Sequence, residues 1–164
     1  MKNNKFNFLV LAFVVLSASS AFAQFSAGFN AGIPTGNWSN YWGMGWGIDA
    51  RYEAAIQKQL NWTASIGFNS FAGKNGITSI TAVPVTGGVK YYVKESNSGA
   101  YVGADIGLYF LSASSGGASG STTRFGFAPV LGYRVNKFDF SFRYNAVTDF
   151  SYVGLRAAYV FPGK

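Results

Sequence analysis

The chain has 164 residues, no cysteine and no histidine, and its formal net charge is +7 although only 12% of its residues are charged. Ordinary soluble domains carry about 25% charged residues. The lack of cysteine excludes a disulfide framework, and the bases are scattered singly, without the basic run that favours binding to nucleic acid.

The first 23 residues have the organisation of a secretory signal peptide. A basic start precedes an apolar run at 8–16, and the small residues Ala21 and Ala23 follow it. The apolar run is shorter than the about 20 residues that a membrane-spanning helix needs. We therefore expect the export machinery to remove residues 1–23 and to leave 24–164 as one domain.

From residue 24 onward, apolar and polar residues alternate with the period of two that is typical of β-strands. A tilted strand needs about 9–11 residues to cross a membrane, and the predicted strands have about that length or more. In chain order the predicted strands lie at 24–33, 44–56, 59–71, 79–93, 100–111, 123–135, 137–145 and 150–161. Within two of them, Pro84 and Pro129 predict a bulge or a local break, because proline cannot donate to a strand ladder.

The connections between these strands fall into a short set and a longer set. They lie, respectively, at 57–58, 94–99 and 136–137, and at 34–43, 72–78 and 112–122. Short turns on the periplasmic side and longer loops outside are typical of outer-membrane barrels. The pattern predicts an all-β fold, an eight-stranded antiparallel up-and-down transmembrane β-barrel.

The two faces of the strands predict which side meets lipid. Of the 21 glycines, 11 fall on the polar faces, and the apolar faces hold no charged residue. The interior of an eight-stranded barrel is just wide enough for side chains to fill, whereas a water-facing surface carries many Lys and Glu. The alternative is a soluble lipocalin-like binding barrel, in which the faces are exchanged. We expect the polar faces to enclose a lumen charge network of Asp49, Arg51, Glu53, Lys90, Asp105, Arg124, Arg134, Asp139, Arg143 and Arg156.

Four phrases carry a likeness to known proteins: VPVTGGVKYYV at 83–93, AYVGADIGLYF at 100–110, FGFAPVLGYR at 125–134 and LRAAYVF at 155–161. They resemble the small outer-membrane β-barrel family typified by OmpA and OmpX, and especially its OmpX-sized members in Bacteroidetes. The resemblance implies a monomeric, integral protein of the Gram-negative outer membrane, whose partners are outer-membrane lipid, lipopolysaccharide and the barrel-assembly machinery. Family members usually end on an aromatic residue that this machinery recognises, whereas Phe161 is followed here by Pro-Gly-Lys.

Three functions fit such a barrel. The first is a non-enzymatic structural or surface-interaction role, with Trp38, Tyr41 and Trp42 on the first outer loop as a contact patch or as anchors of that loop. The second is a lipid-modifying enzyme, which the sequence argues against because no histidine can activate a serine. The third is a narrow ion-conducting pore, which pairing of the lumen charges would block. We expect the first of these functions.

The sequence predicts no metal site and no cofactor. Histidine and cysteine are absent, and Asp49 and Glu53 are too far apart on one strand to form a compact site by themselves. The glycine-rich stretch at 116–120 follows a strand but opens no helix, so it is not a phosphate-binding loop.

Overall fold

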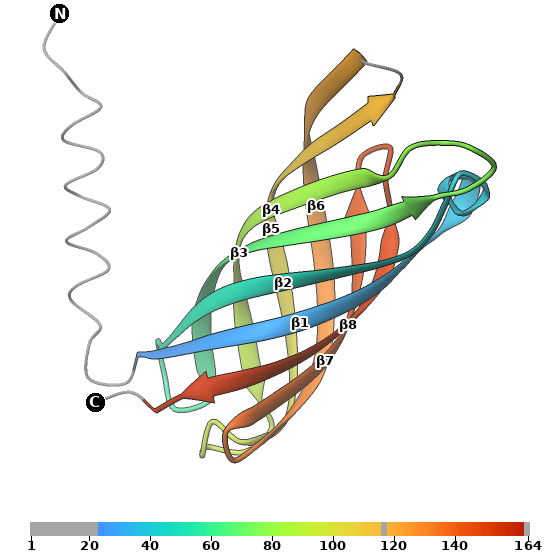
Figure 1. Ribbon diagram of the computed structural model, residues 1–164. Coiled ribbons are helices and arrows are strands. Elements are labelled where there is room, and N and C mark those ends of the chain that lie inside the picture. The colour runs from blue at the N-terminus through green and yellow to red at the C-terminus, as the bar shows by residue number, and fades with distance from the viewer. Residues whose placement is uncertain (1–22, 116–117, 163–164) are drawn as a thin grey trace, which may run out of the picture.

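A computed structural model describes residues 23–115 and 118–162 as a closed barrel of eight antiparallel strands. Each strand pairs with its neighbours in sequence, and β8 pairs with β1 to close the sheet (Figure 1). The strands are β1 Gln24–Pro34, β2 Trp42–Ala55, β3 Leu60–Gly73, β4 Ile80–Tyr92, β5 Gly99–Ser115, β6 Ala118–Val135, β7 Phe138–Val147 and β8 Tyr152–Phe161. This architecture confirms the predicted fold class.

A short 3₁₀ helix, η1 at Gly36–Asn40, lies in the connection between β1 and β2. No helix in the described residues is both long and apolar enough to span a bilayer. The predicted signal peptide lies outside the described residues, except for Ala23, and stays a prediction.

The barrel begins and ends at the same rim, because Phe25 on β1 pairs with Phe161 on β8. We call this rim the terminal end and the opposite rim the loop end. The connections at the terminal end lie at 56–59, 93–98 and 136–137, and the last of these is the shortest. Asn136 has a φ of 52°, a left-handed conformation that asparagine tolerates better than most residues.

The prediction of a loop at 112–122 is wrong, because most of this segment belongs to β5 and β6. The ladder between these strands runs without a register shift as far as the pair Ser115 and Ala118. The ladder between β6 and β7 ends lower, at Gly126, so the hairpin projects beyond the rim (Figure 1). A serine- and glycine-rich sequence resembles a loop, but here the backbone groups of the two segments pair with each other as strands.

Both strand prolines lie at local breaks. The β3–β4 ladder skips Val83 and Pro84, and the β6–β7 ladder skips Ala128 and Pro129, with the same register on either side of each gap. The ladder on the other side of each proline is continuous. The missing N–H of each proline therefore interrupts one ladder locally. Of the two predicted outcomes, the structure has the local break and not the bulge.

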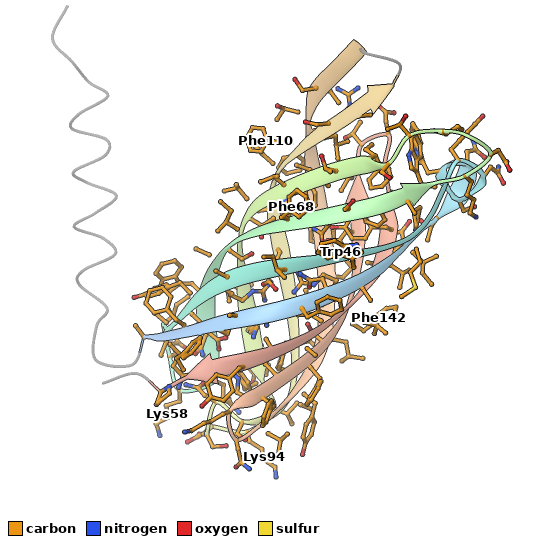
Figure 2. The ribbon with its side chains drawn as sticks, in the orientation of Figure 1. Trp46, Lys58, Phe68, Lys94, Phe110 and Phe142 are labelled. Carbon is orange, nitrogen blue, oxygen red and sulfur yellow. The ribbon has the colours of Figure 1, made fainter. Side chains whose placement is uncertain are left out.

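The outward faces of the strands are apolar, whereas the inward faces hold the charges. Trp46 is 56% exposed, whereas Arg51 and Lys90 are each 1% exposed. No charged side chain lies on the outward face of the strands within the described residues. This arrangement confirms the predicted faces. Figure 2 shows outward-pointing side chains on several strands, among them Trp46, Phe68, Phe110 and Phe142.

Inward glycines make room for the large polar side chains that cross the lumen. A Cβ atom added to Gly28 would lie 2.6 Å from Asp49 Oδ1 and 2.9 Å from Arg156 Nε. A Cβ atom added to Gly132 would overlap the ring of Tyr101. Both positions therefore need a residue without a side chain.

Candidate functional site in the barrel lumen

Four ionised side chains form a charged layer across the lumen near the terminal end. Lys90 Nζ lies 3.0 Å from Glu53 Oε2 and 2.9 Å from Asp139 Oδ2. Arg134 Nη2 lies 2.7 Å and 3.2 Å from the same two oxygens. The side chains of all four are 4% exposed or less. The two acids and two bases therefore balance one another away from water, as buried charges must.

Two tyrosines complete the charged layer. Tyr92 Oη donates to Glu53 Oε1 at 2.8 Å, and Tyr101 Oη donates to Asp139 Oδ1 at 2.7 Å. The Lys90 ammonium also lies 4.3 Å from the centroid of the Tyr101 ring, a cation–π contact. Both tyrosines are fully buried. Sequence reasoning missed them, although their positions share the inward parity of Lys90 and Asp105.

Two further ion pairs lie nearer the middle of the barrel. Arg156 Nε lies 2.9 Å and 2.8 Å from the two oxygens of Asp49, and Arg51 Nη2 donates to Asp105 Oδ2 at 2.7 Å. Arg156 also lies 3.6 Å from Asp139, which links this level to the charged layer. Charge-assisted hydrogen bonds of this length are stronger than neutral ones.

Two of the ten residues predicted to form the network stand apart from these pairs. Arg124 lies at the loop end, where its half-exposed side chain is 3.2 Å from the exposed Asp149, so its place in the lumen network is corrected. Arg143 does face the lumen. Among residues 23–115 and 118–162, however, no carboxylate oxygen lies within 4.0 Å of a side-chain nitrogen of Arg143, which is the limit for an ion pair.

A cluster of aromatic rings, which we call the plug, closes the loop end of the lumen. The ring centroid of Phe150 lies 5.1 Å from that of Phe71 and 5.8 Å from that of Tyr152. It also lies 6.1 Å from the centroids of both Trp38 and Trp42. Phe71 and Phe150 are only 1% exposed, so the plug excludes water.

A tight turn places Phe150 in the plug. The Phe150 N–H donates to the carbonyl of Val147 at 3.1 Å, and Asp149 between them has a φ of 59°. Aspartate adopts this left-handed conformation more readily than most residues do. The connection between β7 and β8 therefore folds over the lumen.

The three residues of the predicted contact patch lie in two different environments, the plug and the outer surface. Trp38 and Trp42 pack against the plug, and Trp42 Nε1 donates to the carbonyl of Thr78 at 3.1 Å. Tyr41 is 48% exposed. The structure thus places the two tryptophans as anchors of the first loop and leaves only Tyr41 broadly accessible.

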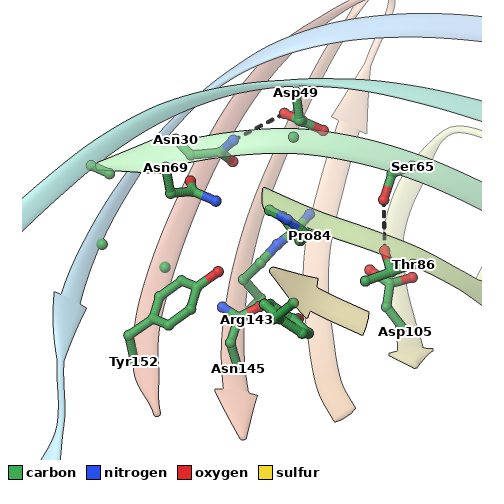
Figure 3. A pocket seen from close by; sticks show the side chains of 15 residues that line it. Asn30, Asp49, Ser65, Asn69, Pro84, Thr86, Asp105, Arg143, Asn145 and Tyr152 are labelled. Carbon is green, nitrogen blue, oxygen red and sulfur yellow. Dashed lines mark hydrogen bonds between the residues drawn. The ribbon is translucent and has the colours of Figure 1, made fainter. Parts of the chain in front are cut away.

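A small polar chamber separates the plug from the middle ion pairs (Figure 3). Its volume is about 30 Å³, and its lining includes Arg143, Asn145, Ser65 and Thr86. A cavity needs about 10–15 Å³ to hold one water molecule, so the chamber has room for at least one small guest.

Two hydroxyl side chains of the chamber lining contact each other. Ser65 Oγ and Thr86 Oγ1 lie 2.7 Å apart and hydrogen-bond to each other, and the chain has no histidine to activate either one. In the part of the chain that the structure describes, no group of three or more acidic, His or Cys side chains could hold a metal ion.

Comparisons with solved structures find the same architecture. Neisserial surface protein A has 18% sequence identity over 87% of this chain and 97% of its own, with a TM-score of 0.64. The attachment invasion locus protein Ail of Yersinia pestis has 16% identity, with coverage of 85% and 97% and a TM-score of 0.58. The chain has the fold of the small outer-membrane β-barrels.

The outer membrane protein OprG from Pseudomonas aeruginosa has 11% sequence identity over 88% of this chain and 98% of its own chain, with a TM-score of 0.54. Comparisons with protein-family models and with curated proteins find no match. At these identities the outer-membrane barrel fold is what the chain shares with its structural neighbours.

Proposed function

We propose that the chain is a non-enzymatic, integral outer-membrane barrel of a Gram-negative bacterium, with its terminal end in the periplasm. The supporting observation is the outward surface, which is apolar around the whole barrel and uncharged on the described strands. Exposed apolar patches on soluble monomers rarely exceed a few hundred Å². A belt on all eight strands therefore favours contact with lipid over contact with water.

Aromatic residues near both rims support the same proposal. Tyr133 and Tyr159 point outward near the terminal end, and Trp46, Phe125 and Tyr144 point outward nearer the loop end. Aromatic girdles at the two membrane interfaces are typical of membrane barrels. The partners that we propose are outer-membrane lipid and lipopolysaccharide at this belt, with the barrel-assembly machinery in transit and a monomer as the final state.

A charge in the middle of the belt tests this proposal. Ile106 is 53% exposed on the outward face and pairs with Gly87 near the middle of β4 and β5. We expect Ile106→Arg to lower the free energy of unfolding in lipid vesicles by about 2–4 kcal/mol, because the bilayer midplane disfavours arginine. Urea unfolding, followed by the heat-modifiable gel migration of folded barrels, measures the loss.

Ile77→Arg is the matched control, because Ile77 is 39% exposed in the connection between β3 and β4 at the loop end. We expect it to change stability by less than about 0.5 kcal/mol, as for other surface substitutions. Similar small effects at both positions, together with extraction of the protein from membranes by carbonate, would favour the soluble barrel instead.

We further propose that the lumen is closed to ions and is not a pore. The charged layer obstructs it near the terminal end, and the plug obstructs it at the loop end. We therefore expect no conductance steps when the purified protein is added to a planar bilayer. A matched larger porin serves as the positive control. Steady, reproducible single-channel steps from this chain would establish the pore alternative.

A surface-interaction role is the second part of the proposal, and the projecting β5–β6 hairpin favours it. Beyond Gly126, β6 has no ladder to β7, although the carbonyl of Phe125 still accepts from the N–H of Thr148 at 3.1 Å. One edge of the described part of this hairpin, at 118–124, is therefore unpaired outside the rim (Figure 1). An unpaired strand edge can accept another strand. Together with the exposed Tyr41, this edge is the surface that we propose for contact with other molecules.

A further inference from the structure

Among the described residues, Arg143 is the one inward base that forms no ion pair with an acid. The described ranges contain all six acids of the chain, and each is paired with a base other than Arg143. Five bases and four acids face the lumen, so its interior has a net charge of one positive unit. The bases are Arg51, Lys90, Arg134, Arg143 and Arg156, and the acids are Asp49, Glu53, Asp105 and Asp139.

The unpaired guanidinium reaches the polar chamber. Arg143 lines this cavity, and its buried Nε and Nη2 atoms have no hydrogen-bond acceptor within the described ranges (Figure 3). Asn145, two residues along β7, is 2% exposed, and its Nδ2 atom also lacks an acceptor there. The Oδ1 atom of the same amide accepts a hydrogen bond from Tyr109 Oη at 3.0 Å. Buried N–H donors thus border one cavity without an acceptor to satisfy them.

The chamber also has acidic side chains in its lining, but they are occupied. Asp49 is bound by Arg156 and by Asn30 Nδ2, which donates at 3.1 Å. Asp105 is bound by Arg51 and by Thr63 Oγ1, which donates at 3.2 Å. Each carboxylate therefore has an ion-pair partner outside the lining, and Arg143 is the base of the lining that has none.

We propose that this chamber binds one small monovalent anion of the chloride type, held by Arg143 and Asn145. One bound anion would bring the net charge of the lumen to zero. It would also accept hydrogen bonds from donors that have no other acceptor. Arg143 as a whole is only partly buried, but its Nε and Nη2 atoms are buried, and buried donors without an acceptor are unfavourable. A water molecule would satisfy these donors without cancelling the charge. The volume of about 30 Å³ favours a small anion over an organic acid. This inference does not depend on the surface role proposed above.

Urea unfolding of the lipid-refolded protein in sodium chloride and in sodium gluconate, at the same ionic strength, tests the site. A ligand that binds only the folded state raises its stability, so chloride should raise the urea midpoint of the natural chain relative to gluconate. We expect Arg143→Gln to weaken the apparent chloride affinity at least tenfold. In gluconate the same variant should unfold at a higher urea concentration than the natural chain, because it removes the inward charge that has no ion-pair partner.

Arg124→Gln is the matched control, since it removes a base outside the lumen and should keep the full chloride effect. Crystals of the natural chain grown in bromide give a second readout that does not depend on folding of a variant. We expect one anomalous bromide peak in the chamber, in contact with Arg143. An equal chloride effect in the natural chain and Arg143→Gln, or a chamber that holds only water in bromide, would overturn the proposal.

Discussion

We expect Lys90→Met to lower the free energy of unfolding by about 3–5 kcal/mol, the range measured when one partner of a buried ion pair is removed. Lys90 is 1% exposed and contacts both Glu53 and Asp139. Without it, the two carboxylates of the charged layer would share Arg134 as their nearest cation. Urea unfolding in lipid vesicles, followed by heat-modifiable migration, measures this loss.

Lys58→Met is the control, because it removes the same side chain from an exposed ion pair. Lys58 Nζ lies 3.3 Å from Glu95 Oε2, with 80% and 64% of the two side chains exposed. Surface pairs contribute about 0–1 kcal/mol, so this variant should stay close to the natural chain. If both variants lose the same small amount, the charged layer is hydrated and the lumen is open at that level.

The second large effect is expected at the plug. Phe150→Ala should lower the free energy of unfolding by about 3–5 kcal/mol, the usual range for a large-to-small change in a packed core. Its ring contacts Phe71, Tyr152 and the two loop tryptophans, and none of these can fill the space without moving. Unfolding by urea gives the stability, and the shift in tryptophan fluorescence reports whether Trp38 and Trp42 lose their packing.

Tyr41→Ala removes an aromatic ring from the same end of the barrel, but Tyr41 is 48% exposed. We expect it to cost about 1–2 kcal/mol, less than Phe150→Ala, because about half of the side chain is already in contact with solvent. A loss of the same size in both variants would show that the first loop, and not the buried Phe150 ring, holds the plug together.

Much of the barrel wall could be predicted from residue alternation. The stretch at 137–145 predicts a strand with phenylalanines on one face, and the structure has β7 at Phe138–Val147 with Phe138, Phe140 and Phe142 pointing outward. The same parity would have placed Tyr92 and Tyr101 inside. Alternation could not predict the projecting hairpin, because a serine- and glycine-rich segment has no apolar face to reveal its pairing.

The sequence could name nine of the inward charges, although it misplaced Arg124, but it could not predict which acid pairs with which base. Lys90 and Asp139 are 49 residues apart, and their contact depends on the registers of all the ladders between β4 and β7. The plug could not be predicted for the same reason. Trp38 and Phe150 meet only because the β1–β2 and β7–β8 connections lie at the same rim of the closed barrel.

The sequence by itself determined the number of strands and the face that each turns outward, because a period of two assigns every side chain to a side. Only the tertiary structure decided which acid neutralises which base and which base has none. The physical reason is closure. Barrel closure sets the height and direction of each inward side chain, and it leaves the guanidinium of Arg143 beside the chamber with every acid already paired.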